Sequence, residues 1–282
     1  MKIAFVGLGS MGAPQARLIA RAGFDLAVHD ALPAAREAFR GVARVGDSAA
    51  DAARGAEIAC VCVRDDQQVE AVVLGAAGLL AGLAPGSILL IHSTIAVATL
   101  EHLRTQLAPK KVALVDAPVT RTRPTDQDAF VFTMLGGEAA DVERARAVIG
   151  TFSTDMEHMG PLGAGMATKI ANNLVTWTHL VVGAEATALA AHYGVPYEKL
   201  RRVMAANGNL TPAVGALLDG KHRFPPGADP ARDQFLASQA GIGEKDLALA
   251  IECAGKARRD VTLIRDTRAL VRPMMTGALE RN

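Results

Sequence analysis

A glycine-rich turn near the start of the chain constrains its fold more than any other feature. An apolar run, residues 3–6, leads into three glycines with the spacing G-x-G-x-x-G, and a helical stretch follows. Gly7 permits a tight turn, Gly9 lets phosphates approach the backbone, and Gly12 allows strand and helix to pack closely. The first N–H groups of the helix would face the anion. The alternative is a glycine-rich structural turn. The pattern predicts a dinucleotide site formed by Gly7, Leu8, Gly9, Ser10, Met11 and Gly12.

An acidic residue after the second apolar run, residues 24–29, refines the expected cofactor. Asp30 stands where a carboxylate accepts hydrogen bonds from the adenine ribose hydroxyls and repels a 2′-phosphate. The next three residues, 31–33, include no arginine that could bind such a phosphate. The sequence therefore favours NAD over NADP. The alternative is that Asp30 caps a helix beginning near Pro33.

Strands and helices alternate in the first half of the chain, and helices alone fill the second half. The predicted strands are residues 2–6, 25–29, 57–63, 87–91, 112–115 and 130–135. This βαβ alternation predicts an α/β Rossmann domain with a doubly wound parallel sheet over residues 1–162. The predicted later helices are residues 165–193, 196–206, 211–219, 230–238 and 243–258, with a loop at Pro225-Pro226-Gly227. They predict an all-helical domain over residues 163–282, with the substrate site at the domain junction.

Composition excludes several classes of protein. The formal net charge of +1 gives no indication of a nucleic-acid or anionic membrane partner. The apolar stretch at residues 175–191 is interrupted by His179, Glu185 and Thr187, so no membrane span is predicted. The first strand begins at residue 2, which leaves no room for a signal peptide and predicts a cytoplasmic location. Cys60 and Cys62 alternate in an apolar strand, which indicates core residues and no disulfide or metal site.

Two polar residues in the first helix of the second half suggest alcohol chemistry. Lys169 and Asn173 are four residues apart, so both project from one helix face. Oxidising an alcohol with NAD requires a base for the hydroxyl proton and a group that holds the oxygen. Burial in an apolar cleft, with the charges of oxidised nicotinamide and Lys245 nearby, would favour the neutral amine. The alternative is a lysine on a solvated helix face.

Four segments of the chain match the motifs of one family in order. They are Gly7–Pro14 (G-L-G-x-M-G-x-P), Asp116–Val119 at the start of a loop, Gly160–Asn173 (G-x-x-G-x-G-x-x-x-K-x-x-x-N) and Lys245–Leu247 within K-D-L-x-x-A. Together they resemble the β-hydroxyacid dehydrogenase family, which includes 3-hydroxyisobutyrate dehydrogenase, over about residues 1–265. The resemblance implies NAD-dependent interconversion of a small β-hydroxy acid and its semialdehyde or keto form. It also implies a homodimer or homotetramer that assembles through the helical domain.

The resemblance assigns roles to individual residues. It gives proton transfer to Lys169 and substrate positioning to Asn173, and it places Asn172 in the substrate site. Three further residues are assigned to the cofactor: Val63, Thr94 and Lys245. The alternatives are that Thr94 caps the following helix and that Lys245 is a surface lysine.

The predicted substrate loop departs from the family pattern D-x-P-V-S-G-G. Thr120 can replace the serine hydroxyl, but Arg121 and Thr122 replace both glycines. The guanidinium adds a fixed fork of donors that suits an anion. An Arg-Thr pair here resembles the sulfolactaldehyde reductase branch, where it helps hold a sulfonate. We therefore expect a small anionic substrate, with a sulfonate first and a second carboxylate or a phosphonate as alternatives. Arg121 could instead point outward and pair with Asp126 or Asp128.

Two other functions are compatible with this architecture. Imine reductases share it but typically lack a lysine at position 169, and a non-catalytic NAD-binding module would be expected to lose Lys169 or Asn173. This chain retains both residues. The sequence therefore favours a dehydrogenase that uses NAD and no metal.

Overall fold

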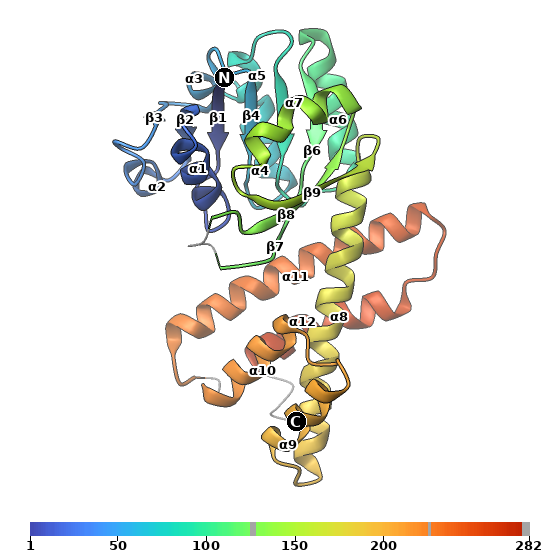
Figure 1. The fold of residues 1–282 in the computed structure, drawn as a ribbon. Helices are drawn as coiled ribbons and strands as arrows, with labels where there is room; N and C mark the ends of the chain where they lie inside the picture. Colours follow the sequence, from blue (N-terminus) through green and yellow to red (C-terminus); the bar gives the residue numbers. More distant parts are fainter. Residues whose placement is uncertain (125–127, 225–226, 278–282) are drawn as a thin grey trace. The chain divides into compact units, whose positions relative to one another are not determined.

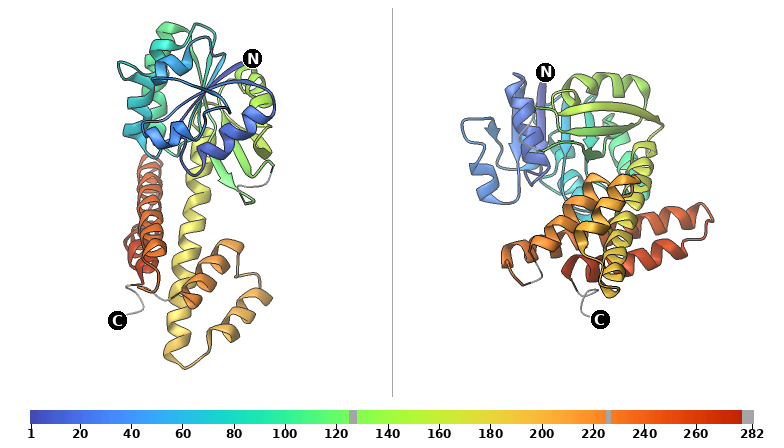
Figure 2. Two further views of the ribbon diagram at one scale, coloured as in Figure 1. Left: turned by 90° about the vertical axis from the view of Figure 1, so that its left-hand side faces the viewer. Right: turned by 60° about the horizontal axis from the view of Figure 1, so that its bottom comes forward.

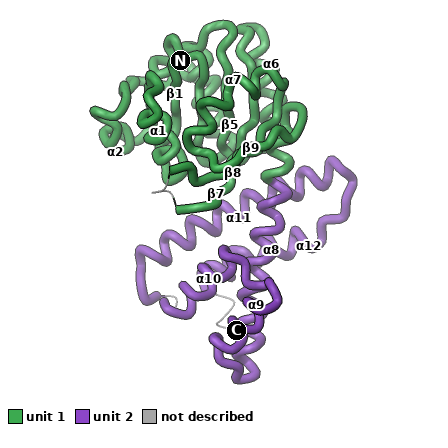
Figure 3. Tube along the Cα trace, viewed as in Figure 1, with its two compact units in different colours: residues 1–169 green, residues 170–282 purple. Residues whose placement is uncertain are grey.

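The computed structural model describes residues 1–124, 128–224 and 227–277 (Figure 1). The chain divides into two compact units, residues 1–169 and 170–282 (Figure 3). This division falls inside one long helix, whereas the sequence placed a domain boundary after residue 162. The predicted loop at Pro225-Pro226 lies outside the described residues.

One mostly parallel sheet forms the centre of the first unit. Its strands among the described residues are β1 (Lys2–Val6), β2 (Asp25–His29), β3 (Arg44–Val45), β4 (Ile58–Val61), β5 (Ile88–Ile91), β6 (Ala113–Asp116), β7 (Val119–Arg121), β8 (Val131–Gly136) and β9 (Ser153–Gly160). The order is β3-β2-β1-β4-β5-β6-β8-β7, and β9 pairs with β8. Strands β1 to β6 are parallel to their neighbours. This arrangement confirms the predicted Rossmann fold and all six predicted strands.

The far edge of the sheet differs from the prediction. β8 runs antiparallel to both β6 and β7, because the chain continues from β6 into the short strand β7 and then turns back as β8 without a crossover helix. β3, β7 and β9 were not predicted. β3 has only two residues and β7 only three. In β9, polar residues are frequent and no apolar run occurs, so its sequence contains no strand signal.

Helices cover both faces of this sheet (Figure 2). The helices of the first unit are α1 (Gly12–Arg21), α2 (Pro33–Glu37), α3 (Ala49–Ala53), α4 (Asp66–Leu74), α5 (Leu79–Gly82), α6 (Val97–Leu107) and α7 (Ala139–Ile149). α1 and α7 contribute Ile19 and Val148 to the core that includes Phe5 and Leu90. Helices α3 to α6 contact one another in a second group. The parallel strands therefore end at an edge between two helical layers, where such folds bind nucleotides.

The second unit consists of helices around a separate apolar core. They are α8 (Ala164–His192), which begins in the first unit, α9 (Tyr197–Ala206), α10 (Pro212–Arg223), α11 (Pro230–Lys256) and α12 (Thr262–Thr276). Their shared core contains Trp177, Val181, Leu218, Leu247 and Met274. The prediction of a helical second half is confirmed.

Two helix assignments need correction. Residues 230–238 and 243–258 were predicted as separate helices, but α11 is continuous across them. Its buried residues Leu236, Ala240, Gly243 and Leu247 follow one helical face without interruption, so packing overrides the glycines between them. α12 was not predicted, since its segment carries several arginines and Pro273 near its end.

The long helix α8 also corrects an expectation about membranes. By length and composition alone, α8 is apolar enough to cross a bilayer, contrary to the sequence prediction. This is weak evidence for a span, because core helices of soluble proteins pass the same test. α8 supplies Trp177, Leu180 and Val181 to the helical core. Only 28% of the most apolar 18-residue stretch of α8 is buried, so much of the surface of this helix remains exposed.

A buried glycine in α11 provides a matched test of packing. A Cβ at Gly243 would lie 2.9 Å from three ring carbons of Trp177, whereas a Cβ at Gly241 would meet only the Arg272 guanidinium at 4.0 Å. We expect Gly243→Ala to lower the free energy of unfolding by about 1–3 kcal/mol through overpacking. Gly241→Ala should raise it by up to about 1 kcal/mol through helix propensity. Urea unfolding followed by the fluorescence of the single tryptophan measures both, and equal effects of the two substitutions would contradict this account.

Candidate active site

The glycine-rich turn has the geometry predicted for it. Gly7 adopts a φ of +98° and donates its N–H to the His29 carbonyl at 3.0 Å. A Cβ at Gly12 would lie 2.0 Å from the Gly7 carbonyl oxygen, so only glycine allows α1 to begin there. A Cβ at Gly9 would meet nothing within 4 Å. The turn therefore combines open space with the N-terminus of a helix, which fits a dinucleotide diphosphate.

Asp30 binds the same turn directly. Its Oδ2 accepts a hydrogen bond from the Leu8 N–H at 2.6 Å, and its Oδ1 accepts one from the Leu32 N–H at 2.8 Å. Helix α2 has Leu32 as its N-cap residue, without a side-chain cap. The carboxylate thus connects the end of β2 to the glycine-rich turn and does not serve as the N-cap of α2.

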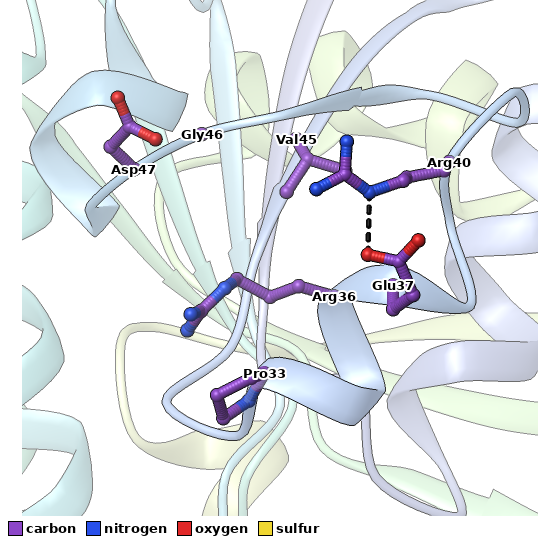
Figure 4. Close-up of a pocket in the computed structure, with 7 residues that line it drawn as sticks. All are labelled: Pro33, Arg36, Glu37, Arg40, Val45, Gly46 and Asp47. Atoms are coloured by element: carbon purple, nitrogen blue, oxygen red, sulfur yellow. Dashed lines mark hydrogen bonds and ion pairs between the residues drawn. The ribbon is translucent and has the colours of Figure 1, made fainter.

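An arginine that the sequence analysis did not consider lies next to Asp30. Arg36 donates to the backbone carbonyls of Asp30 and Ala31 at 2.5 and 3.2 Å. It also lines a pocket of about 220 Å³ with Arg40, which pairs with Glu37 (Figure 4). In these contacts Arg36 uses only Nη1 and Arg40 only Nε, so each guanidinium keeps further N–H donors near Asp30.

A hydrogen bond connects the segments that follow β4 and β5, at two of the predicted cofactor residues. The Val63 N–H donates to the buried Ser93 hydroxyl at 2.8 Å, and Thr94 follows Ser93 in the chain. α6 begins later, with Ala96 as its N-cap residue. Thr94 is therefore not the N-cap of that helix. Sequence reasoning did not identify Ser93.

His92 connects β5 to the start of the predicted substrate loop. Its Nδ1 lies 2.8 Å from the Ala117 carbonyl oxygen, and since a carbonyl only accepts, Nδ1 carries the proton. The ring packs against Phe5 and Phe152. Burial lowers the pKa of His92 to about 4, although the hydrogen bond to Ala117 opposes this shift. His92 is therefore a neutral structural link near neutral pH.

A buried carboxylate holds the beginning of α8. Asp116, at the end of β6, is fully buried and accepts the N–H of Gly163 at 2.7 Å and that of Met166 at 2.6 Å. Burial raises the pKa of Asp116, while these N–H donors act in the opposite direction. A Cβ at Gly165 would lie 2.4 Å from the Met134 carbonyl oxygen, so the helix start is closely packed. Asp116 thus fixes the turn that precedes Lys169.

Lys169 and Asn173 occupy successive turns of α8. Lys169 is 9% exposed, and Asn173 is half-buried. Asn172 is exposed, and as the neighbour of Asn173 it points to another side of the helix. The predicted spacing of the lysine and the asparagine along one helix is therefore present.

Asn173 and Lys245 converge on one buried carboxylate in the helical unit. Asp246 Oδ2 accepts the Asn173 side-chain amide at 2.7 Å and the Trp177 indole N–H at 3.3 Å. The Lys245 Nζ forms an ion pair with Asp246 Oδ1 at 2.9 Å. The Lys245 side chain is 22% exposed, which argues against a purely solvated surface lysine. Sequence reasoning named Asp246 within a motif but gave it no role.

The predicted substrate loop forms the edge strand β7 and the residues after it. Thr120 and Arg121 pair with Phe132 and Val131 of β8, and the Arg121 side chain is exposed. Thr122 continues the pairing, because its N–H donates to the Phe130 carbonyl at 2.9 Å. Of the acids considered as partners for Arg121, Asp128 pairs with Arg21, and Asp126 lies outside the described residues.

Cys60 lies within β4, and Cys62 directly follows this strand. Burial raises the pKa of the Cys60 thiol, and it raises that of Cys62 to about 12, so both stay protonated. Cys60 belongs to the sheet core and Cys62 packs against it, as predicted for core residues. Both are free thiols. Within the described ranges, no group of three or more histidine, cysteine or acidic residues could hold a metal ion.

Two family models match consecutive parts of the chain. Residues 2–160 match the NAD-binding domain of 6-phosphogluconate dehydrogenase. Residues 163–281 match the domain described as NAD-binding of NADP-dependent 3-hydroxyisobutyrate dehydrogenase. The two matches together cover nearly the whole chain.

Curated relatives agree with these matches. The 3-hydroxyisobutyrate dehydrogenase of Pseudomonas aeruginosa is 35% identical over 99% of this chain and 90% of its own. The NAD-dependent L-serine dehydrogenase of the same species is 33% identical over 90% of this chain and 85% of its own. The 3-sulfolactaldehyde reductase of Escherichia coli is 26% identical over 93% of this chain and 94% of its own. The chain belongs to the 3-hydroxyisobutyrate dehydrogenase family of NAD-dependent hydroxyacid dehydrogenases.

Proposed function

We propose that this enzyme interconverts a small anionic β-hydroxy acid and its semialdehyde or keto form, with Lys169 as the general acid and base. The observation that carries the proposal is the placement of Lys169 and Asn173 on successive turns of α8, whose start is fixed by buried Asp116. Family membership supplies the reaction class, and the relatives named above act on small substrates of this kind.

Each residue has a defined task in this scheme. The cofactor, held by the glycine-rich turn and Asp30, would supply the hydride acceptor as NAD and the hydride donor as NADH. The amine of Lys169 takes the hydroxyl proton during oxidation and returns it during reduction. Asn173 holds the substrate oxygen in line for the transfer. The glycine-rich turn binds the diphosphate, and Asp30, Val63, Thr94 and Lys245 contact the rest of the cofactor.

The substrate anion is assigned to the loop at Thr120, Arg121 and Thr122. Arg121 is exposed on an edge strand, where its guanidinium can offer two parallel N–H donors to an anion. A sulfonate is the leading candidate, and the likeness to the Escherichia coli 3-sulfolactaldehyde reductase supports it. A second carboxylate or a phosphonate would use the same donors.

Arg121→Gly tests this assignment. We expect the KM for the anionic substrate to rise at least about tenfold, because a charge-assisted hydrogen bond contributes roughly 1.5–3 kcal/mol. The KM for NAD should change less than about twofold. Steady-state kinetics with each ligand varied in turn gives both values. A similar rise in KM for the substrate and for NAD would contradict binding of the substrate anion by Arg121.

A substrate panel tests the proposed function itself. The purified enzyme is offered 3-hydroxyisobutyrate, glycerate, dihydroxypropanesulfonate, serine and hydroxybutyrates with NAD or NADP, and reduced nicotinamide is followed by absorbance. We expect NAD-dependent oxidation of at least one hydroxy acid, with the sulfonate preferred. A tenfold preference for NADP would contradict the role of Asp30. Reduction of an imine without any alcohol oxidation would favour the imine reductase alternative.

We also infer a cytoplasmic homodimer or homotetramer. Three exposed aliphatic residues, Val175, Val182 and Leu189, are spaced seven apart along α8 and therefore line one side of the helix. A second copy of the chain would remove this apolar stripe from water. Light scattering of the purified enzyme tests the inference, and a monomer at micromolar concentration would contradict it.

A further inference from the structure

We propose that Asp246 is a positioning residue that fixes the orientation of the Asn173 side-chain amide. The inference rests on the proposed function, in which Asn173 holds the substrate oxygen. It concerns the buried group formed by Asn173, Trp177, Lys245 and Asp246 on helices α8 and α11.

The chemistry of the contact determines which end of the amide faces Asp246. An ionised carboxylate only accepts hydrogen bonds, so the amide atom 2.7 Å from Asp246 Oδ2 is the nitrogen of Asn173. The Asn173 carbonyl oxygen therefore points away from Asp246, and the amide nitrogen keeps a second N–H that can donate to the substrate oxygen. Without such a partner, the terminal torsion of an asparagine is broad and nearly two-fold, so both ends would be presented.

The carboxylate is itself held in place by two other side chains. Asp246 is only 3% exposed, and a carboxylate that far from water requires a counter-ion and donors. Lys245 supplies the charge at Oδ1, and the Trp177 indole N–H supplies a second donor at Oδ2. Asp246 therefore has a fixed position from which to orient Asn173.

Close packing explains why the indole can reach Asp246. Asn173 and Trp177 lie one turn apart on α8, and Gly243 and Asp246 lie nearly one turn apart on α11. The Trp177 ring lies against Gly243, where a Cβ would be only 2.9 Å from the ring. The glycine thus admits the ring, and the ring directs its N–H to the carboxylate that also binds Asn173.

A double-mutant cycle tests the proposal. Asp246→Asn keeps the shape of the side chain but offers both a donor and an acceptor, so the Asn173 amide can turn over. We expect Asp246→Asn to lower kcat at least tenfold in the wild-type enzyme. In the Asn173→Ala background, the fold-loss of kcat caused by Asp246→Asn should be at least five times smaller, because no amide remains to be oriented. An effect through Lys245 that is independent of Asn173 is the same in both backgrounds and cancels in this comparison.

The control is another carboxylate of the helical unit. Asp219 accepts hydrogen bonds from Tyr197 and Arg201 and lies outside the proposed site. The fold-change in kcat caused by Asp219→Asn should be the same with and without Asn173→Ala. Unfolding midpoints from Trp177 fluorescence identify variants that fail to fold, and Asp246→Glu, which moves the carboxylate by one methylene, replaces Asp246→Asn in that case.

A readout independent of turnover is also available. NMR of the Asn173 side-chain amide in the wild-type protein should show slow hydrogen exchange, and Asp246→Asn should accelerate it. Equal fold-losses of kcat from Asp246→Asn in both backgrounds, or unchanged amide exchange, would overturn the proposal. An Asn173→Ala enzyme with wild-type kcat would instead refute the role of Asn173 in the proposed function, and with it this inference.

Discussion

Replacing Lys169 with methionine is expected to lower kcat by about 10²–10⁴-fold, the usual contribution of a positioned general base or acid. Methionine fills much of the space of the lysine stem but cannot exchange a proton. The KM for NAD should change little, since the turn at Gly7 and Gly12 is unaltered. In the oxidation direction, the rise of kcat with pH that reflects loss of the lysine proton should disappear. Steady-state kinetics between about pH 6 and 10 measures all three quantities.

Lys199→Met is the matched control for this substitution. Lys199 lies on helix α9 and is exposed, so its removal should leave kcat and its pH profile unchanged. A Lys169→Met enzyme that turns over near the wild-type rate would refute the proposed acid–base role. Loss of NADH binding in that variant, measured by the fluorescence of the reduced nicotinamide, would assign Lys169 to the cofactor instead.

Asp116→Ala is expected to lower the free energy of unfolding of the first unit by about 2–6 kcal/mol. The substitution leaves the N–H groups of Gly163 and Met166 without their acceptor, at roughly 1–3 kcal/mol each. Asp116→Asn should cost less, because one acceptor oxygen remains. Because these N–H groups begin α8, their hydrogen exchange should accelerate in both variants. Mass-spectrometric hydrogen exchange over residues 160–170 and urea unfolding followed by circular dichroism measure these effects.

A partly exposed carboxylate provides the comparison for Asp116. Asp141 lies in the first turn of α7 and pairs with Arg144, whose side chain is half-exposed. Asp141→Ala should lower the free energy of unfolding by no more than about 1 kcal/mol, because solvent-accessible ion pairs usually contribute no more than that. If Asp116→Ala were no more costly than Asp141→Ala, the buried carboxylate would not be what fixes the start of α8.

Local patterns in the sequence predicted much of the fold. The six main strands and the helical second half were found because apolar periodicity extends over neighbouring residues. Elements without such local periodicity were missed, because their stability comes from partners distant in the sequence. They are the short strands β3 and β7, the polar strand β9 and the arginine-rich helix α12. The reversal of β8 follows from the chain path and not from its residues.

The sequence by itself determined the glycine-rich turn, the acid after β2 and the four-residue spacing of Lys169 and Asn173, because each depends only on nearby residues. Tertiary structure alone showed which groups hold these features in place. His92 meets a carbonyl 25 residues away, Asp116 meets α8 after 47 and 50 residues, and Asp246 meets Asn173 after 73. Such pairs carry no local signal. They form only when the folded backbone brings buried polar groups together, where each must find a partner.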